Sequence, residues 1–140
     1  MKLPLLHDEC NCFALRQAAR HVTQIYEHHL GQVGLSAAQF TLLAKLARKP
    51  RRTMVELADA MVMDRTTLVR AMKPLQRDDL VTVEPAPHDA RTHLFSLTEK
   101  GEATLAQALI AWRAAQDEFE KKFGRARAKA LRVELFDVTA

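Results

Sequence analysis

The sequence predicts a mainly α-helical protein that carries one small β-hairpin. Glycine is scarce, with 4 residues in a chain of 140, and aromatic residues make up 6% of the total. This composition suits helices better than an all-β fold. Apolar residues recur every three or four positions over most of the chain, which is the helical period, whereas the strand period is found in two short neighbouring runs.

The first predicted helix covers residues 8–31. Its apolar positions lie three or four residues apart and therefore share one face: Cys12, Leu15, Ala19, Val22, Tyr26 and Leu30. Gly31 and Gly34 are expected to end this helix. Ser36 then begins the next helix, with Gln39 as the partner that completes a capping box.

Two further helices are expected in the middle of the chain. Thr53 and Glu56 form a second capping box, which begins a short helix that ends near Met61. Asp64 is a good N-cap for the following helix, which is expected to run to about Arg77.

The C-terminal half combines a hairpin with long helices. The alternating runs at residues 80–84 and 93–97 predict two strands joined by a long tip, residues 85–92. Thr98 caps the last helical region, about 99–138, and Gly124 interrupts it.

The order of these elements indicates a winged helix-turn-helix, because a hairpin follows directly after a short helix, a tight turn and a second helix. Such a second helix presents its N-terminal side chains to base edges in the major groove of DNA. The candidate contacts on its exposed first turns are Arg65, Thr66, Thr67 and Arg70. A formal net charge of +4 and a pI of about 9.3 permit a nucleic-acid partner.

Other classes of function find little support in the sequence. We find no glycine-rich phosphate loop, nucleophile elbow or zinc-protease motif, so we expect no enzyme, cofactor or metal site. The longest apolar runs are too short to span a membrane, and the leading stretch Leu3–Leu6 is too short for a signal peptide. We therefore expect a cytoplasmic protein in a reducing compartment.

The chain resembles the MarR family of transcription regulators over nearly its whole length. The resemblance is carried by TMVELADAMVMDRTTLVRAMKPLQRDDLV, residues 53–81, and PHDARTHLFSLTEKG, residues 87–101. The second stretch matches the wing signature of the family, formed here by Asp89, Arg91, Leu97, Thr98 and Gly101. By this resemblance, Arg91 enters the minor groove of DNA and Asp89 orients it.

The same resemblance implies how the protein is organised and how it works. It implies a single domain over residues 1–140, with a winged helix-turn-helix at about 36–98 and dimerisation helices at about 8–31 and 99–138. It further implies a homodimer on a pseudo-palindromic operator, acting as a repressor that a small aromatic ligand or thiol oxidation releases. A winged-helix module for protein–protein docking and a thiol-dependent redox enzyme remain the alternatives.

The only two cysteines, Cys10 and Cys12, stay open between several roles. The start of the first helix is similar to that of the organic-hydroperoxide sensors within the family, with Cys12 at their reactive cysteine and Tyr26 at a tyrosine partner. The sequence departs from those sensors at two other tyrosine positions, now Arg16 and Ala37.

Three interpretations of the cysteines follow. Cys12 is either a small buried residue of the dimer interface or a redox sensor that forms a sulfenic acid captured by Cys10 or a partner thiol. A metal site that includes His7 is the third interpretation, and the least supported because further ligands are missing.

Overall fold

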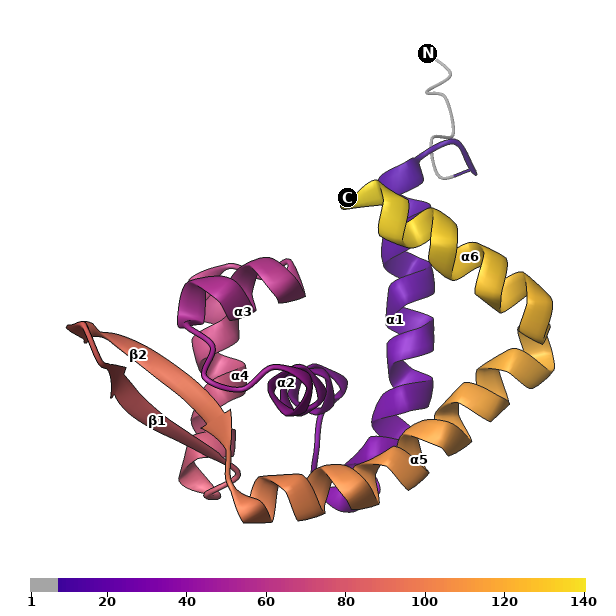
Figure 1. Ribbon diagram of the computed structural model, residues 1–140. Helices are drawn as coiled ribbons and strands as arrows, with labels where there is room; N and C mark the ends of the chain where they lie inside the picture. Colours follow the sequence, from indigo (N-terminus) through magenta and orange to yellow (C-terminus); the bar gives the residue numbers. More distant parts are fainter. Residues whose placement is uncertain (1–7) are drawn as a thin grey trace.

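The computed structural model describes residues 8–140 and shows a winged lobe joined to three long helices (Figure 1). The lobe contains α2 (Ala37–Arg48), α3 (Met54–Met61), α4 (Arg65–Arg77), β1 (Val81–Ala86) and β2 (Asp89–Leu97). The other helices are α1 (Asn11–Leu30), α5 (Glu99–Phe123) and α6 (Arg125–Val138), and a single 3-10 turn, η2 (Gly31–Val33), connects α1 to the lobe. The predicted fold class, mainly helical with a small β wing, is confirmed.

Side-chain caps begin the helices where the sequence predicts them. Ser36 and Thr53 each accept the backbone N–H three residues on, and a Gln39 or Glu56 side chain accepts the cap's own N–H in return. Asp64 and Thr98 cap α4 and α5 in the same way, without the reciprocal bond. These caps satisfy N–H groups that have no acceptor inside the helix, and they fix the helix starts locally.

The start of α1 differs from the prediction. The helix begins at Asn11 and not at Asp8, and Cys10 is its N-cap, with extended backbone and a thiol that accepts the N–H of Phe13 at 3.3 Å. Cys10 and Cys12 are therefore not two residues of one helix, since one precedes it and the other lies in its first turn.

The tip of the hairpin also differs from the prediction. A long tip was expected, but the strands continue to the pair Ala86–Asp89, so that only two residues form the turn. A register shift between Pro85 and Ala86 makes this continuation compatible with the pairing nearer the base. The prediction was wrong because turn-forming residues also fit a bulged strand end.

The core lies inside the winged lobe and where the lobe meets α1 and α5. Its largest fully buried side chains are Leu30, Leu42, Leu43, Leu46, Leu57, Leu68, Met72 and Leu75. By contrast, residues 11–20 of α1 are all exposed, and α6 buries Ala128 alone. The terminal helices therefore present apolar side chains that this single chain does not cover.

Gly101 lies where the wing, α4 and α5 meet. A Cβ atom at this position would overlap the backbone carbonyl oxygen of Leu80. The same oxygen accepts the N–H of Thr98 at 3.1 Å, and the Thr98 hydroxyl donates to the carbonyl of Asp79 at 2.6 Å. The glycine of the wing signature thus permits a close approach between two backbones.

Two further observations concern membranes and metals. No helix within residues 8–140 is long and apolar enough to cross a membrane. In the same part of the chain, no group of three histidine, cysteine or acidic side chains is arranged to hold a metal ion. His7 and Leu3–Leu6 lie outside the described residues.

Candidate nucleic-acid interface

The first turns of α4 present the four candidate side chains to solvent. Arg65, Thr66, Thr67 and Arg70 are all exposed, while Leu68 between them is buried. This separation follows from the helical period, which turns residue 68 towards the core when its neighbours face outwards.

Asp64 organises this helix start. Its carboxylate accepts the backbone N–H of Thr67 at 2.7 Å and the Thr67 hydroxyl at 3.1 Å. These hydrogen bonds, with a smaller contribution from the charge of Arg70, lower the pKa of Asp64. The hydroxyl hydrogen of Thr67 is therefore directed at the cap, which leaves its oxygen as an acceptor.

The wing tip is ordered by Asp89. Its carboxylate accepts the backbone N–H of Arg91 at 3.0 Å and the Thr92 hydroxyl at 3.1 Å. The Arg91 guanidinium lies 3.8 Å from the same carboxylate and its side chain is 97% exposed. Asp89 thus shapes the turn from which Arg91 extends into solvent.

A groove of about 270 Å³ connects the wing to the helix-turn-helix. Arg65 from α4 and Arg91 from β2 both line it, together with Thr53, Met54, Val55, Thr92, His93 and Phe95. The first turn of α3 forms one wall, where backbone N–H groups have no acceptor within the helix. The structure thus brings candidate residues from two elements to one concave, basic surface.

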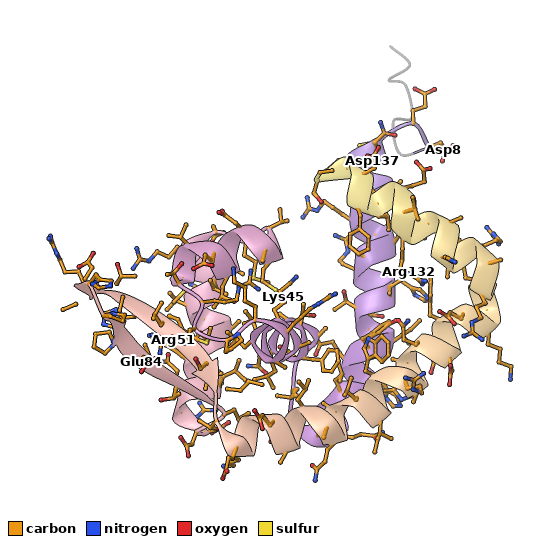
Figure 2. The ribbon with its side chains drawn as sticks, in the orientation of Figure 1. Asp8, Lys45, Arg51, Glu84, Arg132 and Asp137 are labelled. Carbon is orange, nitrogen blue, oxygen red and sulfur yellow. The ribbon has the colours of Figure 1, made fainter. Side chains whose placement is uncertain are left out.

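The basic loop before α3 belongs to the base of the wing. The Arg51 guanidinium pairs with Glu84 of β1 (Figure 2), and the Arg51 N–H donates to the Ser96 hydroxyl at 3.0 Å. Arg52 forms an antiparallel bridge with Phe95. The sequence did not predict this isolated bridge, because a single pair of residues has no periodicity to detect.

A crevice of about 790 Å³ separates the winged lobe from the long helices. Phe40 and Trp112 line it, with ring centroids 6.3 Å apart in a stacked arrangement. Its basic side chains are Lys45, Arg48, Lys49 and Arg52. The crevice therefore offers an aromatic wall and a cationic rim to a ligand.

The two cysteines lie at the exposed start of α1. Both line a shallow depression together with Phe13, Arg16 and Arg20. Cys12 is exposed in the single chain, and Cys10 is half-buried. Cys12 is not buried within one chain, so its burial at a dimer interface would require a second copy of the chain.

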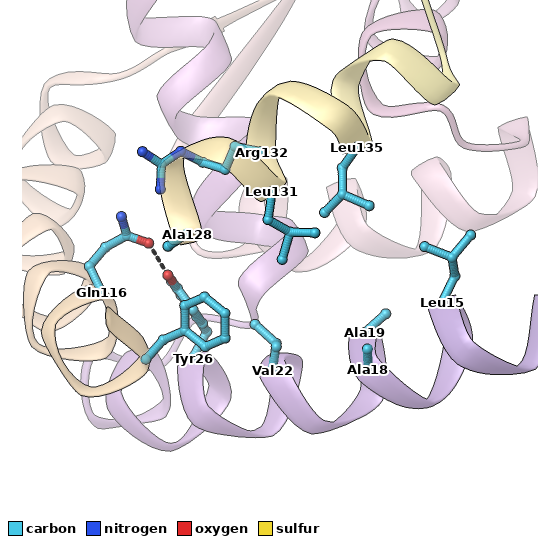
Figure 3. A pocket seen from close by; sticks show the side chains of 11 residues that line it. Leu15, Ala18, Ala19, Val22, Tyr26, Gln116, Ala128, Leu131, Arg132 and Leu135 are labelled. Carbon is cyan, nitrogen blue, oxygen red and sulfur yellow. Dashed lines mark hydrogen bonds between the residues drawn. The ribbon is translucent and has the colours of Figure 1, made fainter. Parts of the chain in front are cut away.

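Tyr26 is remote from these thiols within one chain. Cys12 and Tyr26 are separated by about 21 Å along the helix axis, from a rise of about 1.5 Å per residue. Tyr26 instead lines an apolar cavity of about 470 Å³ between α1 and α6 (Figure 3), where its hydroxyl donates to Gln116. Burial, and then the negative charge of Glu120, raise the pKa of Tyr26. Within one chain, the structure brings Cys10 and Cys12 to one depression and places Tyr26 in a different cavity.

Comparison with known proteins identifies a family. A model of the MarR family matches residues 33–92. The transcriptional regulator HosA of Escherichia coli O111:H- is 30% identical over 105 residues, which cover 75% of this chain and 76% of that protein. The organic hydroperoxide resistance transcriptional regulator of Bacillus subtilis is 28% identical over 90 residues, 64% of this chain but only 61% of that protein.

A solved structure extends the similarity to the whole chain. The transcriptional repressor CouR, bound to a 23-mer DNA duplex, superposes with a TM-score of 0.87 at 28% sequence identity. The alignment covers 100% of this chain and 99% of the CouR chain. CouR has also been solved bound to p-coumaroyl-CoA.

Proposed function

The chain belongs to the MarR family of transcription regulators, and from that premise we propose that it is a repressor that binds a pseudo-palindromic operator as a homodimer. Like its relatives, it is a DNA-binding regulator and not an enzyme. The observation that carries the proposal is the groove shared by Arg65 of α4 and Arg91 of the wing. Because a DNA-binding regulator acts where the DNA is, we also propose that the protein is cytoplasmic.

The proposed contacts divide into base-reading and backbone-reading sets. Arg65, Thr66 and Arg70 extend from the first turns of α4 and would read base edges in the major groove. Thr67 would accept hydrogen bonds there, since its own hydrogen is directed at Asp64. Arg91 would enter the adjacent minor groove, whose narrow form attracts arginine.

The uncovered faces of the terminal helices support the homodimer. Phe13 and Leu15 of α1 are each 45% exposed, and Val133 and Phe136 of α6 are 64% and 71% exposed. Apolar side chains gathered in this way mark an interaction site. A twofold axis through these helices would also present two copies of α4 to two operator half-sites.

Binding as a function of salt tests this function. Operator fragments are first selected from a genomic library, and their affinity is then measured over a range of salt concentrations. Affinity that falls steeply with salt is expected, because bound phosphates release counterions. A protein-docking module would show no such DNA affinity, and a redox enzyme would turn over peroxide repeatedly.

Arg91→Ala gives this test a residue-level form. Loss of one phosphate-proximal cation should weaken binding to all sequences and reduce the salt slope by about one unit. Arg77→Ala is the matched control, because Arg77 is an exposed arginine at the opposite end of α4, beside Asp78. If both variants keep the parental slope, Arg91 is not part of the interface.

The crevice is the proposed site of a releasing ligand. Its stacked Phe40 and Trp112 suit an aromatic ring, and its basic rim suits an anionic group. CouR, a relative with the same fold, binds an aromatic acyl thioester of coenzyme A. We therefore propose a small aromatic acid or its conjugate as the effector.

Thiol oxidation is the second proposed releasing signal. Arg16 and Arg20 line the same depression as both thiols, and cationic surroundings are typical of reactive cysteines. A hydroperoxide would oxidise the Cys12 thiolate to a sulfenate and leave as an alcohol. The thiol of Cys10, or of the partner chain, would then displace hydroxide to form a disulfide.

Disulfide formation at Cys10 would pull on the N-cap of α1, because the same sulfur accepts the Phe13 N–H. Operator binding is therefore compared before and after mild hydroperoxide treatment, in the parent and in Cys12→Ser. Release in the parent with retention in Cys12→Ser would support the sensor. Retention in both would leave a ligand as the signal.

A further inference from the structure

We propose that Arg52 couples the effector crevice to the DNA-binding wing: its guanidinium receives the anionic group of the effector while its backbone holds strand β2. This inference rests on the proposed effector crevice. It adds the residue that reads the ligand's charge and the connection through which the wing responds.

The backbone of Arg52 is tied to β2 by two hydrogen bonds. Its N–H donates to the carbonyl of Phe95 at 3.1 Å, and the Phe95 N–H donates to the carbonyl of Arg52 at 2.8 Å. This mutual exchange is the hydrogen-bonded pair of an antiparallel ladder. Phe95 is only 5% exposed and belongs to the core. Residue 52 therefore cannot shift alone, because it would have to carry β2 or break both bonds.

Arg52 lines the crevice, and its side chain carries a buried, unsatisfied donor just behind that surface. Its Nε atom is buried and has no hydrogen-bond partner within residues 8–140. The neighbouring Arg51 differs, because its guanidinium is paired with Glu84. Buried donors on charged groups are nearly always satisfied, so an unpaired one indicates an acceptor that the single chain does not supply. A carboxylate or phosphate oxygen is the acceptor that best matches a guanidinium.

The Arg52–Phe95 pair has one member at the crevice and the other at the DNA groove. Arg52 lines the crevice, whereas Phe95 lines the groove that also contains Arg65 and Arg91. Each site is thus lined by one member of the same hydrogen-bonded backbone pair. Beyond Phe95, the same strand leads within four residues to Arg91 at the wing tip.

This arrangement explains how an anion could alter DNA binding. A ligand shifts a conformational equilibrium only if it binds one arrangement better than the other. If the Arg52 guanidinium turns to meet an anion, the change is transmitted to β2 through the two backbone bonds. The wing then leaves the position in which Arg65 and Arg91 share one groove.

Trp112 makes the ligand step directly observable. It is the only tryptophan of the chain and it lines the crevice, so its fluorescence reports occupation of this site. Benzoate and benzamide serve as probes, because they share a ring and differ in charge. We expect benzoate to change the fluorescence of the parent and to bind at least about tenfold more tightly than benzamide, as a charge-assisted hydrogen bond predicts.

The variants separate the role of Arg52 from that of basic charge in general. Arg52→Gln removes the guanidinium and keeps the backbone pair, and it should lose the preference for benzoate. Arg51→Gln is the matched control: it removes the same charge from the adjacent residue, outside the crevice, and should keep the preference. Arg52→Lys is made as well, so that a folding defect of the glutamine variant does not decide the result; it should retain part of the preference.

The coupling is measured as the ratio of operator Kd with and without benzoate, so that any change in basal affinity cancels. Sodium acetate at equal concentration controls for ionic strength. The parent and Arg51→Gln should show a raised ratio, and Arg52→Gln a ratio near one. A glutamine variant that still prefers benzoate and still releases operator would overturn the proposal.

The remaining outcomes distinguish failure of the anion site, of the proposed function and of the coupling. No fluorescence response to millimolar benzoate would overturn the anion site, even if operator binding persists. If the parent does not bind the operator even without benzoate, the proposed function itself is overturned. A benzoate preference that disappears in Arg52→Gln while operator release persists would assign ligand binding to Arg52 and refute the coupling.

Discussion

Gly101→Ala should destabilise the protein, although alanine favours helices. The new methyl group would overlap the carbonyl oxygen of Leu80, so the start of α5 would have to move away from the joint between α4 and β1. That movement weakens the bonds from the Thr98 N–H to Leu80 and from the Thr98 hydroxyl to Asp79.

The size of the effect follows from three contributions. Overpacking at a close contact costs about 1–3 kcal/mol. Weakening two hydrogen bonds adds about 1 kcal/mol each. The higher helix propensity of alanine offsets about 1 kcal/mol. We therefore expect Gly101→Ala to lower the free energy of unfolding by about 2–4 kcal/mol.

The assay is urea unfolding followed by circular dichroism at fixed protein concentration, since dimerisation makes stability concentration-dependent. Gly31→Ala is the control, because Gly31 has helical backbone dihedrals and open space where a Cβ would lie. Its unfolding midpoint should stay constant or rise. A Gly101→Ala protein as stable as the parent would refute the close-approach argument.

Three further predictions concern the helix-turn-helix. Val62→Gly should raise the free energy of unfolding by about 1 kcal/mol, measured by urea denaturation, since this β-branched, 71% exposed residue has a left-handed φ of 51°. Asp64→Ala should destabilise the protein at pH 7. The hydrogen bonds from Thr67 lower the pKa of Asp64 in the folded state below its usual 3.8. The stability difference between parent and variant should therefore shrink as the pH of the unfolding assay falls below that value. Arg70→Ala should relax base preference at one position of each half-site by about 1–3 kcal/mol, measured with single-base operator variants; unchanged preference at every position would contradict the docking.

Local features of the sequence predicted most of the fold. Ser36, Thr53, Asp64 and Thr98 each cap the helix that was expected from them, and the helical break at Gly124 is present, with a φ of 102°. Capping involves residues three positions apart, so the pattern that encodes it is visible in the sequence. The turn at the wing tip was mispredicted, because its length depends on the register between two strands.

The candidate interface was predictable in its parts but not in its assembly. The helical period places Arg65 and Arg70 on an exposed turn, and the wing signature singles out Arg91. That Arg65 and Arg91 line one groove with His93 follows only from the packing of the hairpin beside α3 and α4. No motif in the sequence indicates such a juxtaposition.

The sequence by itself determined the order of elements, the starts of α2 to α5, and the residues that face away from the core, because each depends on neighbours within one or two helical turns. The tertiary structure alone decided that Tyr26 lines a cavity against α5 and α6, that Gly101 must lack a side chain, and that Arg52 joins the wing. These properties arise from contacts between residues distant in the chain. Their physical basis is the packing of one element against another, which no local period or capping pattern encodes.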